Sequence, residues 1–299
     1  MADRFDVIEV GQSGRRRWVG LVVVVAVVLV PVVGLIVSRE PEPQAVESAV
    51  PTPIRSLTRI DSPPNLLQVT AARRGDDEVI QVVFPHGARA EVRYPAELGL
   101  ARMGSRPFQG MWVDGLYRQV MAPYNGEIEV TRGGQPIRSY APNVTLWPRQ
   151  AGSGSYGQVL LFAFERWRLA MYDRGEGLTF DQRLAVARNL KGRVTDAGYL
   201  VLSSAGEQVR LARPGETRGD DPGDRDPVGP QLWFGGGTRQ MVALVPAPDC
   251  EKQAEVPSVI EGRGRPAESV CRGGVRVAVT GADWFREAAL KGIRVTLKD

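Results

Sequence analysis

Histidine, the side chain most often used for acid–base chemistry and metal binding at neutral pH, occurs once in these 299 residues. His86 stands between Pro85 and Gly87, a sequence typical of a tight turn between two strands. A Ser-His-Asp site or a histidine metal cluster would have to be built around this single side chain. We therefore interpret His86 as a turn residue and expect no site of either kind.

Two other patterns resemble ligand-binding motifs. The aspartates Asp220, Asp221, Asp224 and Asp226 crowd one segment, but their order lacks the spacing and the terminal Glu of an EF-hand. The stretch Gly152–Gly157 fits G-x-G-x-x-G by letter, yet a phosphate-binding loop must open a helix, and here a strand is predicted to follow. We interpret the aspartate-rich segment as a solvated acidic loop, and we expect the protein to bind no metal and no cofactor.

Aromatic side chains are the most suggestive feature of the middle of the chain. They punctuate a Gly/Pro-rich stretch, residues 108–156, at Phe108, Trp112, Tyr117, Tyr124, Tyr140, Trp147 and Tyr156. Such residues either line a binding groove or pack a loop-rich segment onto a sheet. The sequence leaves both interpretations open.

Catalysis would have to rest on Asp, Glu, Ser or Tyr, because histidine and reactive cysteine are nearly absent. The sequence therefore identifies no catalytic residue and favours a binding, sensing or structural module over an enzyme. The alternative is an envelope hydrolase that acts on a glycan with two carboxylates, which would face each other across a groove at about 5–10 Å.

The elements that would position these residues begin with an apolar segment at 18–37. It contains no charged residue, and eleven of its twenty residues are valine. Twenty helical residues span about 30 Å, the thickness of the hydrocarbon core of a bilayer, whereas the apolar part of a signal peptide is shorter. We expect one transmembrane helix that binds the lipid bilayer.

Charge sets the expected orientation. Arg15, Arg16 and Arg17 precede the apolar run, whereas Arg39 is followed by Glu40 and Glu42. The positive-inside rule then places residues 1–17 in the cytoplasm as a short tail and the C-terminal part outside the membrane.

The only two cysteines, Cys250 and Cys271, lie in the exported part, so we expect them to form a disulfide.

Residues 38–65 hold six prolines and few large apolar side chains, which is typical of a linker. The remaining 66–299 are long enough to bury a sizeable core. The excess of positive charge in this part of the chain is small and evenly spread, so we expect no nucleic-acid partner. An envelope protein or a cell-wall component is a partner that fits the expected compartment better.

The exported part is predicted to be α+β, with mostly antiparallel strands and a few short helices. Strands at 79–85 and 89–94 flank the turn at His86, and a short helix is expected at 96–103. The same order recurs as strands at 158–164 and 167–172 and a helix at 180–191, which suggests two related halves, 66–145 and 146–299.

Helix ends are marked in the sequence. Thr179 with Gln182 forms a capping-box pattern, Leu184, Ala187 and Leu190 form an apolar stripe, and Gly192 is the expected stop. A last helix is expected to have Asp283 as its cap, with Trp284, Phe285, Ala288 and Leu290 able to face the core, and to end at Gly292 before a final strand.

The segment from Gly177 through Asn189 to Thr195 resembles one that is common in the extracytoplasmic parts of uncharacterised actinobacterial membrane proteins. It is also similar to helices in some anti-sigma-factor ectodomains. The resemblance covers under a tenth of the chain and carries no functional residue. It implies an envelope protein, while residues 1–17 are too few to hold a sigma-factor-binding module.

Overall fold

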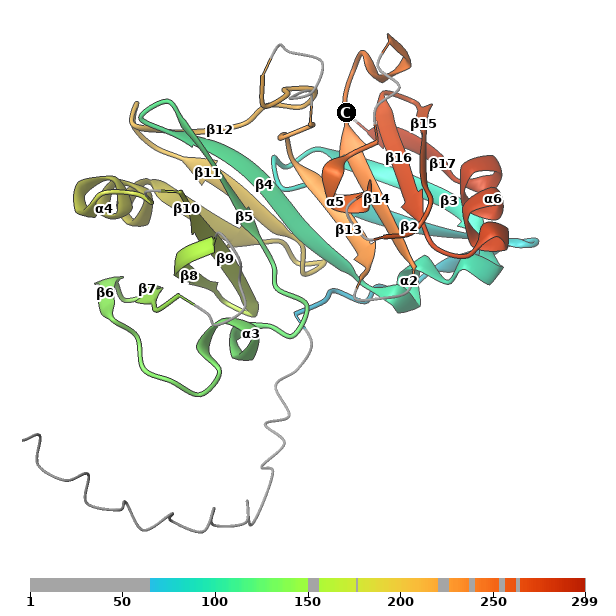
Figure 1. Cartoon of the computed structure of the whole chain (residues 1–299). Coiled ribbons are helices and arrows are strands. Elements are labelled where there is room, and N and C mark those ends of the chain that lie inside the picture. Colours follow the sequence, from blue (N-terminus) through green and yellow to red (C-terminus); the bar gives the residue numbers. More distant parts are fainter. Residues whose placement is uncertain are drawn as a thin grey trace, which may run out of the picture. The chain divides into compact units, whose positions relative to one another are not determined.

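The computed structural model describes residues 65–149, 156–175, 177–219, 226–236, 240–252, 256–261 and 264–298 (Figure 1). The cytoplasmic tail, the transmembrane helix at 18–37 and nearly all of the linker that the sequence predicts lie outside these residues. Within the described ranges, no helix is long and apolar enough to cross a membrane.

A large antiparallel sheet dominates the described chain, in the order β15-β16-β14-β13-β4-β5-β9-β8-β7-β6, with β12 also paired to β4. Its strands are β4 (Ser105–Val113), β5 (Leu116–Met121), β6 (Arg138–Ala141), β7 (Val144–Trp147), β8 (Tyr156–Phe164), β9 (Trp167–Arg174), β12 (Val209–Leu211), β13 (Gln231–Gly235), β14 (Met241–Pro246), β15 (Ala267–Arg272) and β16 (Val275–Thr280).

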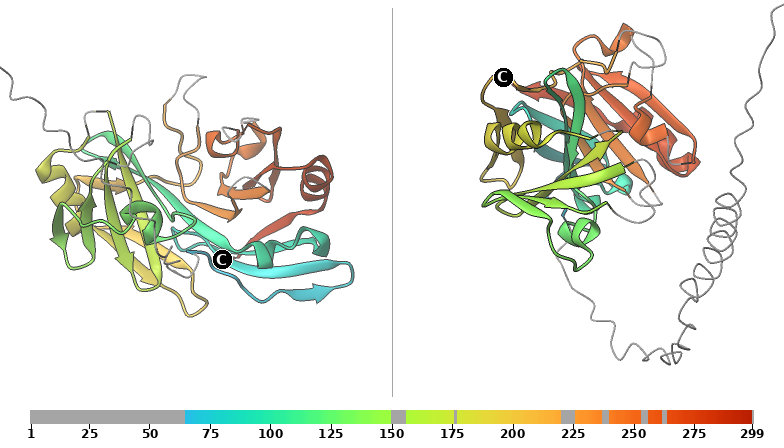
Figure 2. Two further views of the ribbon diagram at one scale, coloured as in Figure 1. Left: turned by 60° about the horizontal axis from the view of Figure 1, so that its bottom comes forward. Right: turned by 60° about the vertical axis from the view of Figure 1, so that its left-hand side comes forward.

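Two smaller sheets complete the strand pairing. One has the order β1-β2-β3-β17 and consists of β1 (Ala72–Arg74), β2 (Asp77–Val83), β3 (Arg89–Pro95) and β17 (Arg294–Lys298). The other pairs β10 (Leu190–Val194) with β11 (Leu200–Ser204). Figure 2 shows the last strand of the described chain, in red, beside the early strand β3, in cyan.

The helices are short. They are η1 (Ala96–Leu98), α2 (Leu100–Met103), α3 (Glu127–Thr131), α4 (Phe180–Asn189), η3 (Cys250–Lys252), α5 (Ser258–Glu261) and α6 (Asp283–Gly292). The described chain is therefore strand-rich and mostly antiparallel, with few and short helices, as the alternation of apolar and polar residues predicted. In β3, for example, Ala90, Val92 and Tyr94 are buried while Arg89 and Arg93 are exposed.

One order of elements occurs three times: a hairpin, a short helix, then a strand. The hairpin β2–β3 leads through η1 and α2 into β4, β8–β9 leads through α4 into β10, and β15–β16 leads through α6 into β17. The sequence indicated the first two. The strands that leave the first and third of these groups make pairings distant in sequence: β4 pairs with β13 as well as with the adjacent β5, and β17 pairs with β3.

Several predicted helix boundaries were wrong. The helix expected at 96–103 is divided at Gly99, whose φ of 60° ends η1. The helix expected at 180–191 ends at Asn189. Of the predicted stripe, Ala187 and Leu190 are buried, the latter as the first residue of β10, whereas Leu184 is half-buried; Ala185 and Val186 are buried as well. Gly192 lies inside β10, where a Cβ atom would stand 2.5 Å from the ring of Phe164.

The C-terminal helix differs in detail from its prediction as well. Ala282 is the N-cap of α6, and Asp283 is its first residue. Phe285 is fully buried, whereas Trp284 is 53% exposed and faces away from the core. The helix does end at Gly292, as expected.

The predicted pairing of the two cysteines is confirmed. Cys250, at the start of η3, is disulfide-bonded to Cys271 in β15, and their Cα atoms lie 5.6 Å apart. This separation is within the ordinary range for a disulfide. The bond ties the segment after β14 to a strand two places away in the large sheet.

Candidate functional site

Strand β4 presents a row of large side chains on one face of the large sheet. Because side chains alternate along a strand, Arg106, Phe108 and Trp112 share that face, with Gly110 between them. Neighbouring strands add Tyr117 from β5 and Trp233 from β13. We call these six residues the β4 face.

Aromatic rings and arginines stack along this face. The rings of Phe108 and Trp233 lie 4.8 Å apart with 22° between their planes. The guanidinium of Arg106 lies 5.7 Å from the Trp233 ring and 5.4 Å from the Tyr124 ring, and it donates to the carbonyl of Ala122 at 3.0 Å. Arg106 is itself buried, so this end of the face is rigid before any ligand arrives.

A loop crosses the β4 face at Gly110. The amide of Gly110 donates to the carbonyl of Val228 at 3.0 Å, and a Cβ atom at this position would stand 2.2 Å from that carbonyl oxygen. Only glycine allows so close an approach of two backbones. The crossing leaves one hollow on each side of Gly110.

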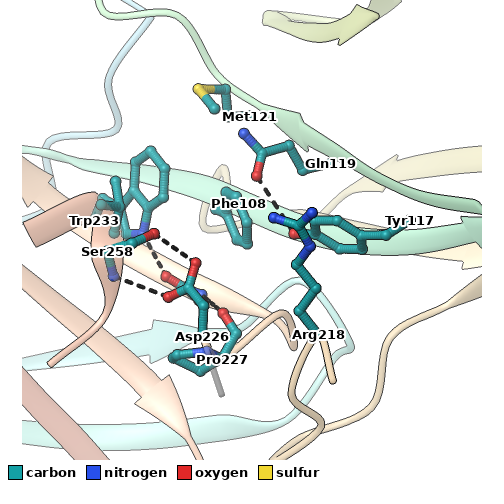
Figure 3. Close-up of a pocket in the computed structure, with 11 residues that line it drawn as sticks. Phe108, Tyr117, Gln119, Met121, Arg218, Asp226, Pro227, Trp233 and Ser258 are labelled. Carbon is teal, nitrogen blue, oxygen red and sulfur yellow. Dashed lines mark hydrogen bonds between the residues drawn. The ribbon is translucent and has the colours of Figure 1, made fainter. Parts of the chain in front are cut away.

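The first hollow, which we call the aromatic pocket, has a volume of about 230 Å³ (Figure 3). Its lining combines the stacked pair with polar and apolar side chains from β5, β13, α5 and the crossing loop. The lining residues are Phe108, Tyr117, Gln119, Met121, Arg218, Asp226, Pro227, Gln231, Trp233, Ser258 and Val259.

The floor of the aromatic pocket is held by hydrogen bonds. Gln231 accepts from the indole N–H of Trp233 at 2.8 Å and donates to the carbonyl of Pro227 at 2.8 Å. Both Gln231 and Trp233 are buried, whereas Tyr117, Gln119 and Met121 are only partly covered. A ligand would therefore meet a fixed floor and reach the partly exposed side chains of the wall.

The charged groups of the aromatic pocket come from the crossing loop. The carboxylate of Asp226 accepts from the backbone amide of Ser258 at 2.9 Å and from its hydroxyl at 2.5 Å. The guanidinium of Arg218 lies 5.8 Å from the centre of the Tyr117 ring. As Figure 3 shows, Asp226 points toward α5 and Arg218 toward β5, on opposite sides of the pocket.

The second hollow, about 360 Å³, lies at the other end of β4 and is lined by Trp112, Asp114, Gly115, Glu207, Gln208 and Arg210. Glu216 stands beside it. Its carboxylate accepts from the indole N–H of Trp112 at 2.7 Å and from both terminal nitrogens of Arg210 at 2.7 and 2.8 Å. The hydrogen bond from Arg210, aided by those from Arg213 and Trp112, lowers the pKa of Glu216 to about 2.

The other residues singled out from the sequence lie elsewhere. His86 is exposed in the turn between β2 and β3, 5.9 Å from the ring of Phe84. Of the acidic segment only Asp226 is described, and the residues placed by the structure contain no cluster of acidic, histidine and cysteine side chains that could hold a metal ion. The glycine-rich stretch at 152–155 lies outside the described residues.

The aromatic residues of 108–156 divide between two roles. Phe108, Trp112 and Tyr117 line the two hollows, and Tyr124 packs against Arg106 at their margin. Trp147 is buried in a separate apolar cluster, and Tyr140 contacts Phe180 of α4. Sequence reasoning missed Trp233, Gln231 and Arg218, because only the pairing of β13 with β4 and the path of the crossing loop bring them here.

Chemically, the aromatic pocket can stack a ring and hydrogen-bond its edges through amide and phenol groups, and its lining contains one cation, Arg218, and one anion, Asp226. Its described lining contains neither histidine nor cysteine and only one carboxylate. This combination is typical of recognition, and the one hydroxyl paired with a carboxylate in the described lining is that of Ser258, which donates to Asp226 at 2.5 Å.

Comparisons with protein-family models, with curated proteins and with solved structures gave no match to this chain.

Proposed function

We propose that the chain is a membrane-anchored binding module of a bacterial cell envelope, which recognises a small, ring-bearing polar ligand in the aromatic pocket. The observation that carries this proposal is the stacked Phe108–Trp233 pair beneath a wall of phenol, amide and guanidinium groups. Aromatic surface combined with a few directed polar groups is the usual composition of a small-molecule site.

The size of the aromatic pocket limits the ligand. Its volume of about 230 Å³ is below the range of about 300–1,000 Å³ that is usual for drug-sized molecules. One sugar ring, or one ring at the end of a larger envelope glycan, suits that space. Amide and phenol groups match the hydroxyl and acetamido groups of such a sugar.

The anchor, the linker and the two related halves belong to this proposal. Residues 18–37 would cross the membrane once, with 1–17 in the cytoplasm, and 38–65 would extend the domain away from the bilayer. Cysteine labels introduced at Ser13 and Ser56 test the orientation. Labelling from outside intact cells should reach Ser56→Cys and spare Ser13→Cys, and the opposite pattern would refute it.

The binding proposal can be tested by titrating the full chain with N-acetylglucosamine and the cell-wall disaccharide while following tryptophan fluorescence. Replacing Trp233 would disturb the core, so wall residues are the better targets. Gln119→Ala and Tyr117→Phe each remove one or two hydrogen-bonding groups and should weaken binding about three- to tenfold. Tyr140→Ala, an aromatic change outside the pocket, is the control and should leave the affinity unchanged.

Failure of both sugars to bind in a saturable manner to the folded protein would refute recognition of a sugar ring. Binding that Tyr140→Ala weakened as much as Gln119→Ala would place the site elsewhere.

A carboxylate-based glycan hydrolase is the second candidate, and the second hollow is where it would act. Asp114 and Glu207 both line this hollow beside Trp112, and all lie near the end of β4. Digestion of purified cell wall by the full chain, abolished by Asp114→Asn or Glu207→Gln, would support this function over binding. Unchanged cell wall after prolonged incubation would exclude it.

A further inference from the structure

A third cavity, separate from the β4 face, lies between the β2–β3 hairpin and the β10–β11 hairpin. Its volume is about 560 Å³, and residues from both hairpins and from β17 line it. Two hydrogen bonds hold the hairpins together: the amide of Leu202 donates to the carbonyl of Pro85 at 2.7 Å, and the hydroxyl of Tyr199 donates to the carbonyl of Gln81 at 3.0 Å. The walls of this hairpin cavity are thus joined at two points.

Positive charge predominates in the hairpin cavity. Arg89 from β3, Arg193 from β10 and Lys298 from β17 line it, against one acidic residue, Asp196. Arg89 and Lys298 are direct partners in the register of β3 and β17, so their side chains project from the same face. The lining carries a net charge of +2, counted as three cations minus one anion.

The two arginines are unpaired within the described chain. Other arginines of the described chain form ion pairs. Arg183 pairs with Asp173 at 2.8 Å, and Arg210 pairs with Glu216 at 2.7 Å. By contrast, neither Arg89 nor Arg193 lies within ion-pair distance of any described carboxylate, including that of Asp196. Lys298 is partly neutralised by Glu91 at 3.2 Å.

A hydroxyl group adds a further donor. Thr195, in the turn between β10 and β11, accepts from the amide of Tyr199 at 3.1 Å, which leaves the hydroxyl hydrogen of Thr195 able to donate. Two planar guanidinium groups, an ammonium group and a hydroxyl around one cavity match the oxygens of a tetrahedral dianion better than those of a neutral molecule.

We infer that the hairpin cavity binds a phosphate group, held by Arg89 and Arg193 with Lys298 and Thr195 in support. The phosphate could belong to a soluble phosphorylated molecule or to a lipid headgroup, and the chemistry of recognition is the same for both. This site is independent of the aromatic pocket, with which it shares no lining residue.

The test is calorimetric titration of the full chain, in a neutral detergent and a chloride buffer, with inorganic phosphate and with pyrophosphate. Both should bind at one site, and pyrophosphate should bind more tightly because it carries more charge. Arg89→Gln and Arg193→Gln should each weaken binding about three- to tenfold. Asp196→Asn should strengthen it about two- to threefold, because a like charge leaves the cavity.

Arg188→Gln is the matched control. Arg188 is an exposed arginine of α4 that does not line the cavity, so this variant lowers the net charge equally without touching the site. Its affinity should stay within about twofold of the parent. Absence of saturable binding of either anion by the folded parent protein, or equal weakening by Arg188→Gln, would overturn the inference.

Two further probes distinguish the sources of the phosphate. Glycerol phosphate represents a soluble or polymer-borne group, and vesicles of phosphatidylglycerol represent a headgroup. Binding of glycerol phosphate that depends on Arg193 supports a soluble source, and vesicle binding alone that depends on Arg193 supports a lipid. Binding of neither probe, like failure of the anion titration, overturns the inference while leaving the aromatic pocket untouched.

Discussion

Glu216 shows how one side chain can fix the path of a loop. Its carboxylate joins Trp112 on β4, Arg210 on β12 and the backbone amide of Arg213, at 2.7 to 2.8 Å. The loop that begins here then crosses Gly110 and supplies Arg218 and Asp226 to the aromatic pocket. The geometry of that pocket therefore depends on a carboxylate that does not line it.

We predict that Glu216→Gln lowers the free energy of unfolding by about 1–2 kcal/mol at pH 7, because charge-assisted hydrogen bonds are replaced by weaker neutral ones. The pKa of Glu216 is lowered from 4.5 to about 2, so its stabilising effect is complete above pH 4.5 and is lost as the pH falls toward 2. Urea unfolding at a series of pH values checks this. The parent and the variant should converge near pH 2, and a gap that stays constant down to pH 2 would contradict the assignment.

Gly110 gives a second prediction at this scale. In Gly110→Ala the new methyl group would stand 2.2 Å from the carbonyl oxygen of Val228, so the crossing loop must move. We expect a loss of about 2–3 kcal/mol in the free energy of unfolding. Gly157→Ala is the control, since Gly157 lies in β8 with its nearest neighbour at an ordinary 3.5 Å. Equal unfolding midpoints for the two variants would show that the loop does not press on β4.

At the scale of elements, local signals were predicted well and contacts distant in sequence were not. The capping box of α4 was readable because both partners lie within one turn: the hydroxyl of Thr179 accepts from the amide of Gln182 at 3.3 Å, and the side chain of Gln182 accepts in return at 3.0 Å. The role of Gly192 was misread, because glycine there avoids the ring of Phe164, which comes from another strand.

The aromatic pocket could not be predicted from the sequence for the same reason: it depends on contacts between residues far apart in the chain. Phe108 and Trp112 were visible as candidates, but Trp233 joins them only because β13 pairs with β4 in a register that sets Gln231 opposite Phe108. Register between strands far apart in the chain depends on the whole sheet. The hairpin cavity likewise requires β10–β11 to contact β2, which no periodicity in the sequence indicates.

The disulfide is the element-scale feature most open to experiment. It links two residues with a sequence separation of 21. On the chain-entropy account, closing a loop of this length raises the free energy of unfolding by about 3 kcal/mol. We predict that Cys250→Ser with Cys271→Ser lowers the free energy of unfolding by that amount. Reductant should lower the stability of the parent to that of the double variant and leave the variant unaffected. Free thiols at both positions in protein purified without reductant would contradict the pairing.

At the scale of the whole molecule, the sheets join the beginning of the described chain to its end. Strand β17 completes the sheet started by β1, β2 and β3, while β13, β14 and β16 extend the large sheet from β4. Residues 61–299 accordingly form one compact unit. Because 66–145 and 146–299 each supply strands to the same sheets, neither stretch can unfold without exposing an edge of the other.

We therefore predict that a soluble fragment of residues 66–299 folds without the anchor and unfolds in one cooperative transition, followed in parallel by tryptophan fluorescence and circular dichroism. The sequence predicts no metal or cofactor for this fragment, so a chelator should leave the midpoint unchanged. A midpoint lowered by several degrees would instead reveal a bound ion, because a ligand that binds only the native state stabilises it by mass action. Two separate transitions would show that the halves unfold independently despite their shared sheets. The sugar and phosphate titrations can then be repeated on this fragment without detergent. Loss of binding on removal of the anchor would show that part of the site concerned lies in the first 65 residues.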